Sequence, residues 1–310
     1  MRNWSVIGSG VAGLCVATVL HEKGESIEVI EDPTVPSASY LAGGMLAPYC
    51  EQESASKEVV EQGINAIEWW DKHVSSVHKN GSLVLAPPRD AAELIRFAKM
   101  TEENEWVDPS DLEPDLKGHI SKGLYFPKEA HLDPRLSLDE LRQKLIASGV
   151  DFHTQKPSGN IIDCTGIRAA KNISNLRAVR GEMLNFECPD VNLKRAIRLL
   201  HPRALCYLVP RHNGQYMLGT TMVESYDTSP ISARALIEML SSAYAIHPAF
   251  AEARIIETGT GLRPAYPDNM PKIEYQEGCF FVNGMYRHGY LLAPYMANQL
   301  LNYISQESKS

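Results

Sequence analysis

The sequence lacks an excess of positive charge. Among its 310 residues, 30 lysines and arginines stand against 38 aspartates and glutamates, which gives a formal net charge of −8 and an isoelectric point near 5.7. Proteins that bind nucleic acid or an anionic membrane surface through phosphates carry a basic face or stripe. The composition therefore argues against nucleic acid and against a membrane as partners.

Long apolar runs are also missing. No uninterrupted stretch reaches the roughly 20 residues needed to cross a bilayer. The apolar N-terminal stretch follows Arg2 as a secretory signal would, but glycines interrupt it and an acidic strand continues the pattern. We therefore expect this stretch to be folded structure, and the protein to be soluble and cytoplasmic.

Cysteine pairs and metal-binding motifs are absent as well. The six cysteines include no CxxC pair, and a chain of this length does not need disulfides for stability, so we expect reduced and mostly buried thiols. The ten histidines form no HExxH motif, and His73 and His78 are five positions apart, which suits one helix face poorly. No metal site is expected.

What the sequence does contain is a glycine-rich turn between a strand and a helix. Residues 4–7 predict a strand, residues 11–23 predict a helix, and Gly8, Gly10 and Gly13 lie between and within them in GxGxxG spacing. The first glycine permits a tight turn, the second lets the backbone approach a pyrophosphate, and the third lets the helix pack closely on the strand. The pattern predicts a dinucleotide site.

An acidic residue follows at the distance that such a site requires. A second strand, expected over residues 26–30, delivers Glu31, where an acid accepts hydrogen bonds from ribose hydroxyls. Asp32 comes next, and no arginine lies nearby, so a ribose 2′-phosphate would meet two uncompensated negative charges. These residues predict an adenine dinucleotide and disfavour NADP.

The rest of the chain mixes helices with a run of strands. Helices are expected over residues 56–78, 90–103, 136–148, 232–247 and from 291 onward, and strands over 82–86, 160–166, 182–186, 195–200, 205–211, 215–222, 254–258 and 280–284. Asn213-Gly214 predicts a hairpin between two of these strands. We predict an α/β fold in which an antiparallel substrate domain is inserted into a nucleotide-binding domain, to which the chain returns at residues 254–258.

Two arginines lie in apolar, glycine-bounded frames. Arg263 belongs to Gly261-Leu262-Arg263-Pro264, and Arg287 belongs to the segment 283–294, which reads NGMYRHGYLLAP. A buried arginine needs an anionic partner, and its planar fork suits a carboxylate. Taken singly, each arginine is more commonly paired with an acid of the protein than with a ligand.

Four motifs together resemble a known family. The GxGxxG turn with Glu31, AGGMLAP at 42–48, GLRP at 261–264 and NGMYRHGYLLAP at 283–294 are similar to the D-amino-acid oxidase superfamily, closest to its glycine oxidase branch of thiamine biosynthesis. The similarity spans essentially the whole chain. It implies a Rossmann-like FAD-binding domain of the glutathione-reductase type over 1–80, 133–178 and 260–310, and an interleaved antiparallel-sheet substrate-binding domain over 81–132 and 179–259.

The resemblance also implies noncovalently bound FAD and the residues that contact it. The adenosine and pyrophosphate side would be held by Gly8, Gly10, Val11, Ala12, Gly13 and Glu31. The pyrophosphate and flavin would lie along Ala42, Gly43, Gly44, Met45, Leu46, Thr165, Gly166, Gly284, His288, Gly289, Tyr290, Leu291 and Leu292. Residues 163–166 depart from the small-residue run that the family has here. From the residues alone, this segment is either a strand end that contacts the nucleotide or a strand end without a ligand.

For the substrate, the resemblance implies a small amino acid held by its carboxylate. Tyr207 and Arg263 match the carboxylate-binding pair, Arg287 matches a further active-site arginine, and Met45 and Met222 would line the pocket. The implied reaction oxidises glycine to its imino acid, which water converts to glyoxylate and ammonia. Molecular oxygen then reoxidises the flavin and gives hydrogen peroxide, and the product would supply thiamine thiazole synthesis.

Alternatives remain open at the level of the sequence. A sister oxidase or dehydrogenase acting on sarcosine or a D-amino acid would share the fold and differ only in the pocket. A flavin-binding protein without redox turnover is disfavoured by the pairing of Arg263 with Tyr207, and an NAD dehydrogenase is disfavoured by the C-terminal motif. The sequence also leaves open whether the chain forms a homo-oligomer.

Overall fold

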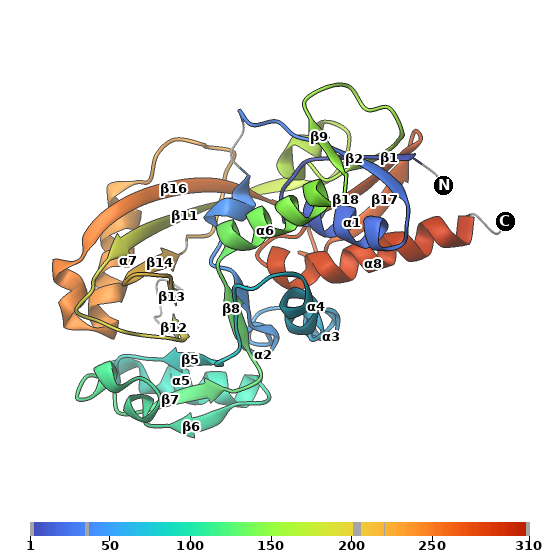
Figure 1. Ribbon diagram of the computed structural model, residues 1–310. Helices are drawn as coiled ribbons and strands as arrows, with labels where there is room; N and C mark the ends of the chain where they lie inside the picture. Colours follow the sequence, from blue (N-terminus) through green and yellow to red (C-terminus); the bar gives the residue numbers. More distant parts are fainter. Residues whose placement is uncertain (1–2, 35–36, 201–205, 220, 308–310) are drawn as a thin grey trace.

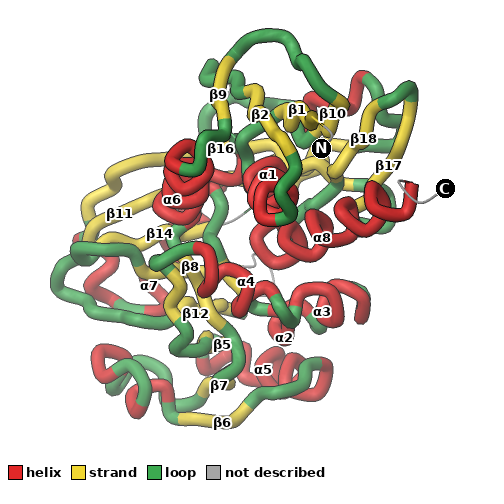
Figure 2. The backbone as a smooth tube through the Cα atoms, turned by 45° about the vertical axis from the view of Figure 1, so that its right-hand side comes forward, coloured by secondary structure: helices red, strands yellow, loops and turns green. Residues whose placement is uncertain are grey.

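Three β-sheets and eight α-helices make up the described part of the protein (Figures 1 and 2). The computed structural model describes residues 3–34, 37–200, 206–219 and 221–307. The helices are α1 (Val11–Glu22), α2 (Pro48–Glu51), α3 (Lys57–Gly63), α4 (Ala66–His73), α5 (Ala91–Met100), α6 (Pro134–Ala147), α7 (Ala233–Ile246) and α8 (Gly289–Glu307). None of the helices in these ranges combines the length and the apolar character of a membrane-spanning segment.

The first sheet carries the glycine-rich turn. In spatial order its strands are β17 (Lys272–Gln276), β18 (Cys279–Asn283), β10 (Asn160–Asp163), β1 (Asn3–Ile7), β2 (Ser26–Ile30) and β9 (Asp151–His153). All neighbours pair in parallel except β17, which forms an antiparallel hairpin with β18. The buried helix α1 crosses from β1 to β2 and packs between α6 and α8. This arrangement confirms the predicted strand-turn-helix-strand unit.

The second sheet is larger and mostly antiparallel. Its strands run β15 (Val223–Glu224), β11 (Arg177–Glu187), β14 (Gln215–Gly219), β13 (Cys206–Pro210), β12 (Ala196–Leu199), β5 (Ser82–Leu85), β7 (Gly123–Phe126) and β6 (Glu105–Val107), with β16 (Arg254–Ala265) paired along β11. Among the described residues of this sheet, only β12 and β5 are parallel neighbours. Helix α7 packs against β13 and β14, and α5 packs against β7.

A small third sheet connects the two larger ones. It consists of β3 (Met45–Leu46), β8 (Ala130–Leu132) and β4 (Val77–His78). In Figure 1, β8 runs between the lower layer, which contains β5 and β7, and the upper layer, which contains α1 and α6. Because β3 follows directly on the predicted glycine segment at 42–44, this small sheet fixes where that segment lies.

The predicted hairpin at Asn213-Gly214 is confirmed. Strands β13 and β14 pair antiparallel on either side of it. Asn213 has a φ of +59° and Gly214 a φ of +69°, which is the left-handed geometry that a tight hairpin turn requires and that asparagine and glycine tolerate best. The amide of Arg211 donates a hydrogen bond to the carbonyl oxygen of Gln215 across the turn, at 2.8 Å.

Two expectations about the elements are wrong. The single helix predicted over residues 56–78 is two helices, α3 and α4, followed by strand β4. The break follows Gly63, where a Cβ would lie 2.5 Å from Cγ of Leu291 on α8. Close packing against α8 therefore selects glycine at the position where the helix ends, and the apolar spacing alone continues past it.

The return to the first domain at residues 254–258 is also wrong. These residues begin β16, which pairs with β11 from Arg254 opposite Glu187 to Ala265 opposite Arg177. The local pattern of a strand does not contain the identity of its partner, which is why the strand was assigned to the other sheet. The domain division remains a prediction, and β11 and β16 run across its boundaries at 178/179 and 259/260 (Figure 1).

Candidate active site

A cavity of about 770 Å³ lies where the carboxyl ends of β1 and β10 face strands β11, β13 and β16. This size is typical of a small-molecule site, and the end of a parallel sheet is where α/β folds bind ligands. The predicted residues that line it are Gly8, Gly10, Val11, Ala12, Ala42, Gly43, Gly44, Met45, Thr165, Gly166, Tyr207, Arg263, Arg287, His288, Gly289, Tyr290 and Leu291. Segments from all parts of the sequence are thus brought to one place.

The glycine-rich turn has the close approaches expected of the fingerprint. Gly8 has a φ of +103°, and a Cβ there would lie 2.8 Å from the carbonyl oxygen of Cys164. A Cβ on Gly13 would overlap the carbonyl oxygen of Gly8, so this glycine lets α1 approach the turn. Gly13 serves this packing and does not line the cavity. Within the glycine-rich turn, the residues that line it run from Gly8 to Ala12.

Two helix N-termini meet at the cavity. Gly289, the first residue of α8, lies against Val11, the first residue of α1, and a Cβ on Gly289 would be 3.2 Å from Cγ1 of Val11. Neither helix has an acidic residue in its first turn. Helix N-termini favour negative charge, so the cavity fits a ligand with a pyrophosphate and an electron-accepting ring, as FAD has. The final helix begins two residues before the expected Leu291.

Glu31 lies in an adjoining cavity of about 550 Å³. Asp32, Thr165 and Arg168 line both this cavity and the larger one, so the two are contiguous. The carboxylate of Glu31 accepts two hydrogen bonds from Arg142, one from Nε at 3.1 Å and one from Nη2 at 2.8 Å. These bonds lower the pKa of Glu31 against the opposing effect of burial. Glu31 is therefore ionised and its carboxylate is held in place at the wall of this cavity.

The expectation that no arginine compensates the acids at 31 and 32 is wrong. Arg142 pairs with Glu31, and Nη1 of Arg168 lies 2.6 Å from Oδ2 of Asp32. Both arginines come from segments more than one hundred residues away, so they were not visible near the acids in the sequence. The electrostatic argument against a 2′-phosphate is weakened accordingly.

At the other end of the cavity, Tyr207 and Arg263 lie on a floor of glycines. A Cβ on Gly43 would overlap the ring of Tyr207, and a Cβ on Gly219 would lie 3.0 Å from Oη of Tyr207. A Cβ on Gly181 would overlap the guanidinium of Arg263. Residues without side chains at these three positions make room for the tyrosine and the arginine. Sequence reasoning missed Gly181 and Gly219, which stand inside ordinary strand patterns.

The chemistry of this pair is set by burial. Burial raises the pKa of Tyr207, and the nearby charges of Arg263 and Arg287 only partly oppose it, so the phenol stays protonated and can donate a hydrogen bond. Burial lowers the pKa of Arg263, while Tyr207 acts in the opposite direction. Nη1 of Arg263 donates to the carbonyl oxygen of Thr221 at 3.2 Å. The guanidinium is thereby held in place at the cavity wall.

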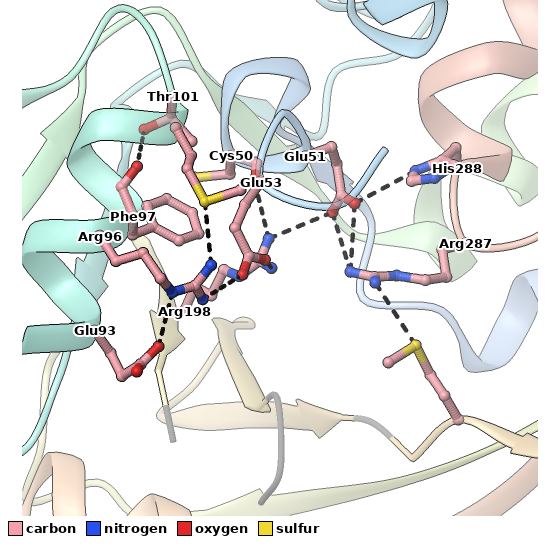
Figure 3. A network of polar contacts seen from close by, with 12 residues as sticks. Cys50, Glu51, Glu53, Glu93, Arg96, Phe97, Thr101, Arg198, Arg287 and His288 are labelled. Carbon is pink, nitrogen blue, oxygen red and sulfur yellow. Dashed lines mark hydrogen bonds and ion pairs between the residues drawn. The ribbon is translucent and has the colours of Figure 1, made fainter. Parts of the chain in front are cut away.

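Arg287 pairs with an acid of the protein. Its Nη2 lies 3.3 Å from the carboxylate of Glu51, which also lines the cavity. Glu51 has two further basic neighbours, Nδ1 of His288 and Nη1 of Arg198, each at 3.7 Å (Figure 3). For Arg287, the alternative of a protein acid is therefore the observed one. Sequence reasoning missed Glu51, whose only local signal is an acid three residues after the AGGMLAP motif.

The remaining predicted residues lie around the cavity. Met222 lies outside its lining and is 41% exposed, but its Sδ is 3.6 Å from Nη1 of Arg287. Leu46 and Leu292 are fully buried in the core and do not face the cavity. Gly284 has a φ of +80°, and a Cβ there would overlap the ring of Tyr266, so it shapes the turn before α8. The expectation that these four residues line the ligand site is not met among the described residues.

No group of three histidine, cysteine, aspartate or glutamate side chains within residues 3–34, 37–200, 206–219 and 221–307 is arranged to hold a metal ion. Each cysteine has a free thiol, and Cys279 alone of the six is not fully buried. Burial raises the pKa of all six thiols. They are poor nucleophiles in this state.

Comparison with known proteins agrees with the geometry. The chain matches the FAD dependent oxidoreductase family, DAO, over residues 3–302. It is 47% identical, across 95% of its length and 94% of the relative's, to a Rhizobium etli protein whose name assigns it provisionally to thiamine biosynthesis as the oxidoreductase ThiO. It is 23% identical to a glycine oxidase of Bacillus licheniformis, across 93% of this chain and 89% of the relative.

A solved structure has the same fold. The glycine oxidase from Bacillus cereus superposes with a TM-score of 0.81 at 21% sequence identity, covering 99% of this chain and 96% of the other. The mixed α/β architecture with several sheets is thus that of the glycine oxidase structures. The chain belongs to the DAO family of FAD dependent oxidoreductases.

Proposed function

We propose that the protein binds FAD noncovalently and oxidises a small amino acid, with glycine as the preferred substrate. The observation that carries the proposal is the position of Tyr207 and Arg263 on their glycine floor, in the same cavity as the dinucleotide fingerprint. A hydrogen-bond donor and a guanidinium beside each other suit one carboxylate. The glycine oxidase names of relatives support the choice of substrate.

In this proposal the residues of the chain act by placing the substrate. Arg263 and the protonated Tyr207 hold the carboxylate, so that the α-carbon faces the part of the cavity next to the start of α8. FAD, held along the glycine-rich turn and the start of α8, would supply the electron acceptor for oxidation at the α-carbon, with oxygen as the final acceptor and hydrogen peroxide as the product. Water then hydrolyses the imino acid to glyoxylate and ammonia. The N-terminus of α8 favours negative charge at this end of the cavity.

We further infer a place in the synthesis of the thiamine thiazole. The support is the 47% identity to the Rhizobium etli protein, which extends over nearly the whole of both chains. A strain that lacks this gene and grows without thiamine as well as the parent, under conditions in which no other enzyme supplies glyoxylate imine, would contradict the inference. Growth restored by thiamine or by the gene would support it.

The direct experiment is a spectrum of the purified protein before and after glycine is added without oxygen. We expect a yellow protein whose flavin absorbance is bleached, and hydrogen peroxide on readmission of air. Heat or acid denaturation should release the flavin into the supernatant, because the proposal includes no covalent bond. A protein that retains flavin but is not reduced by any amino acid would contradict the oxidase proposal.

The same assay ranks the substrates. Glycine, sarcosine, D-alanine and D-proline are compared by initial rates of peroxide formation, with an artificial electron acceptor in parallel to detect a dehydrogenase. Glycine should have the highest kcat/KM. A clear preference for sarcosine or for one of the D-amino acids would replace glycine and leave the fold and cofactor proposals intact.

A further inference from the structure

The second arginine of the cavity has a built-in counter-charge. Arg287 and Glu51 both line the cavity, and the guanidinium lies 3.3 Å from the carboxylate (Figure 3). Each side chain is 17% exposed, so little water separates or screens the pair. In this geometry the carboxylate occupies one face of the guanidinium fork that a ligand acid would otherwise use.

The charge of Glu51 is permanent. Burial acts to raise the pKa of its carboxyl, but Arg287, His288 and Arg198 outweigh burial and lower the pKa to about 2. Glu51 therefore stays ionised at any pH at which the protein works, and it cannot serve as a proton acceptor there. Its contribution is a fixed negative charge at the cavity wall.

The backbone that carries Glu51 is held from both sides. The amide of Cys50 donates to Oε1 of Glu129 at 2.7 Å, and the carbonyl oxygen of Cys50 accepts from Nη1 of Arg198 at 3.0 Å. Arg198 is held in turn by Glu53, whose Oε2 is 3.0 Å from its Nη2. The backbone N–H and C=O of the residue before Glu51 are thus both bonded to buried or partly buried side chains, which fixes the backbone from which the Glu51 side chain projects.

Arg198 shows the same matching of charge. It lines the cavity too, but its guanidinium is directed to Glu53 and to the backbone of Cys50. Two of the cationic side chains around the substrate end are therefore each neutralised by an acid from the short segment 51–53. A ligand acid that approached either arginine would meet a carboxylate of the protein as well.

We propose that Glu51 is a specificity-determining residue that neutralises Arg287 and so restricts the site to substrates with a single acid group. The proposal rests on the proposed function, in which Arg263 and Tyr207 take that one carboxylate. A second carboxylate on the substrate, as in a dicarboxylic amino acid or imino acid, is repelled by Glu51 where it would otherwise pair with Arg287. Discrimination of this kind uses repulsion as well as attraction.

The test uses carboxylates that carry no amine and do not react, so that differences in their dissociation constants come from their acid groups. Acetate, malonate and succinate are titrated into the FAD-loaded protein, and dissociation constants are taken from the change in flavin absorbance. In the unmodified protein, neither dianion should bind more tightly than acetate. Tighter binding of malonate or succinate by about tenfold or more would overturn the proposal without any variant.

The variant Glu51→Gln keeps the shape of the side chain and removes its charge. We expect the ratio of the acetate to the dianion dissociation constant to rise by about tenfold or more, because Arg287 becomes available to the second carboxylate. In the double variant Glu51→Gln, Arg287→Met this gain should disappear. An unchanged ratio in E51Q, or a gain that survives removal of Arg287, would overturn the proposal.

Two further variants serve as controls. Glu93→Gln makes the same change of formal charge at the outer end of the network in Figure 3, where Glu93 pairs with Arg96 on the exposed side of α5, and it should leave the ratio unchanged. Glu51→Asp keeps the charge and should keep the discrimination. Because these readouts need only bound flavin, a protein that fails to oxidise glycine can still pass or fail this test, so the two proposals are separable.

Discussion

The ring of Tyr207 lies directly against Gly43, so closely that a Cβ on this glycine would overlap it. Gly43 belongs to the segment that leads into β3, whereas Tyr207 is in β13 of the large sheet. The contact therefore joins the expected flavin-binding segment to the expected substrate-binding side chain. A side chain added at Gly43 would therefore contact the ring of Tyr207 first.

Gly43→Ala should displace the ring of Tyr207. A Cβ on residue 43 would lie 2.4 Å from Cε2 of Tyr207, so the ring has to move to admit it. We expect the KM for glycine to rise about tenfold while flavin content and the melting temperature change little, since loss of one charged-group hydrogen bond is worth roughly 1.5–3 kcal/mol. Steady-state kinetics and the ratio of flavin to protein absorbance measure the two effects. Loss of flavin with an unchanged KM would contradict the placement of Gly43 beside Tyr207.

Replacing Arg263 tests the carboxylate clamp directly. Arg263→Ala should raise KM by about 10- to 100-fold or more, because a charge-assisted hydrogen bond is worth roughly 1.5–3 kcal/mol and more when desolvated. Arg263→Lys should also be poor, since an ammonium does not reproduce the planar fork. The flavin spectrum should remain nearly intact in both variants. Normal kinetics in either the alanine or the lysine variant would refute the role.

The sequence predicts the nucleotide end of the site better than the substrate end, for a physical reason. The fingerprint from Gly8 to Gly13 is one local unit in which turn, helix and strand follow one another, so its geometry is determined by near neighbours. Glu51 and Arg287 are 236 positions apart and meet only because α2 and the turn before α8 are brought to the same wall. No local pattern contains that pairing.

Strand register explains what else was missed. Gly181 makes room for Arg263 because β11 and β16 pair with Val179 opposite Arg263, which brings the guanidinium over a residue two positions further along. From the sequence, Gly181 is an unremarked glycine in a strand. The local pattern of β16 does not contain its pairing with β11, so the contact of Arg263 with Gly181 does not follow from the sequence.

Glu31→Ala should weaken FAD retention. The carboxylate lies at the adjoining cavity and is oriented by the two hydrogen bonds from Arg142. Losing its bonds to ribose should raise the dissociation constant of FAD by about tenfold or more, at roughly 1.5–3 kcal/mol for hydrogen bonds to a charged group. Flavin fluorescence on dilution measures the release. Glu140→Gln, which also removes one negative charge but on α6, should retain FAD. Equal retention of FAD by the two variants would count against the ribose role of Glu31.

A buried histidine, His131, should make the protein sensitive to acid. This residue in β8 is 2% exposed and stacks on His78 with ring centroids 5.0 Å apart, and its Nδ1 has no hydrogen-bond partner among the described residues. Burial lowers the pKa of His131 to about 3, and the charges of His78 and Arg211 act in the same direction. The pKa of His78 is lowered too, first by burial and then by His212 and Arg211, against Asp133.

In the unfolded chain the pKa of a histidine is about 6.5. The unfolded state therefore binds a proton at His131 between about pH 6.5 and pH 3 that the folded state does not, so stability is fully present above about pH 6.5 and falls as the pH is lowered through this range. Between pH 7.5 and pH 4.5 the loss is on the order of 3 kcal/mol. His131→Gln removes the titration, so its free energy of unfolding in urea should fall less between pH 7.5 and pH 4.5 than that of the parent. Parallel curves for the two proteins would show that His131 does not contribute to acid sensitivity.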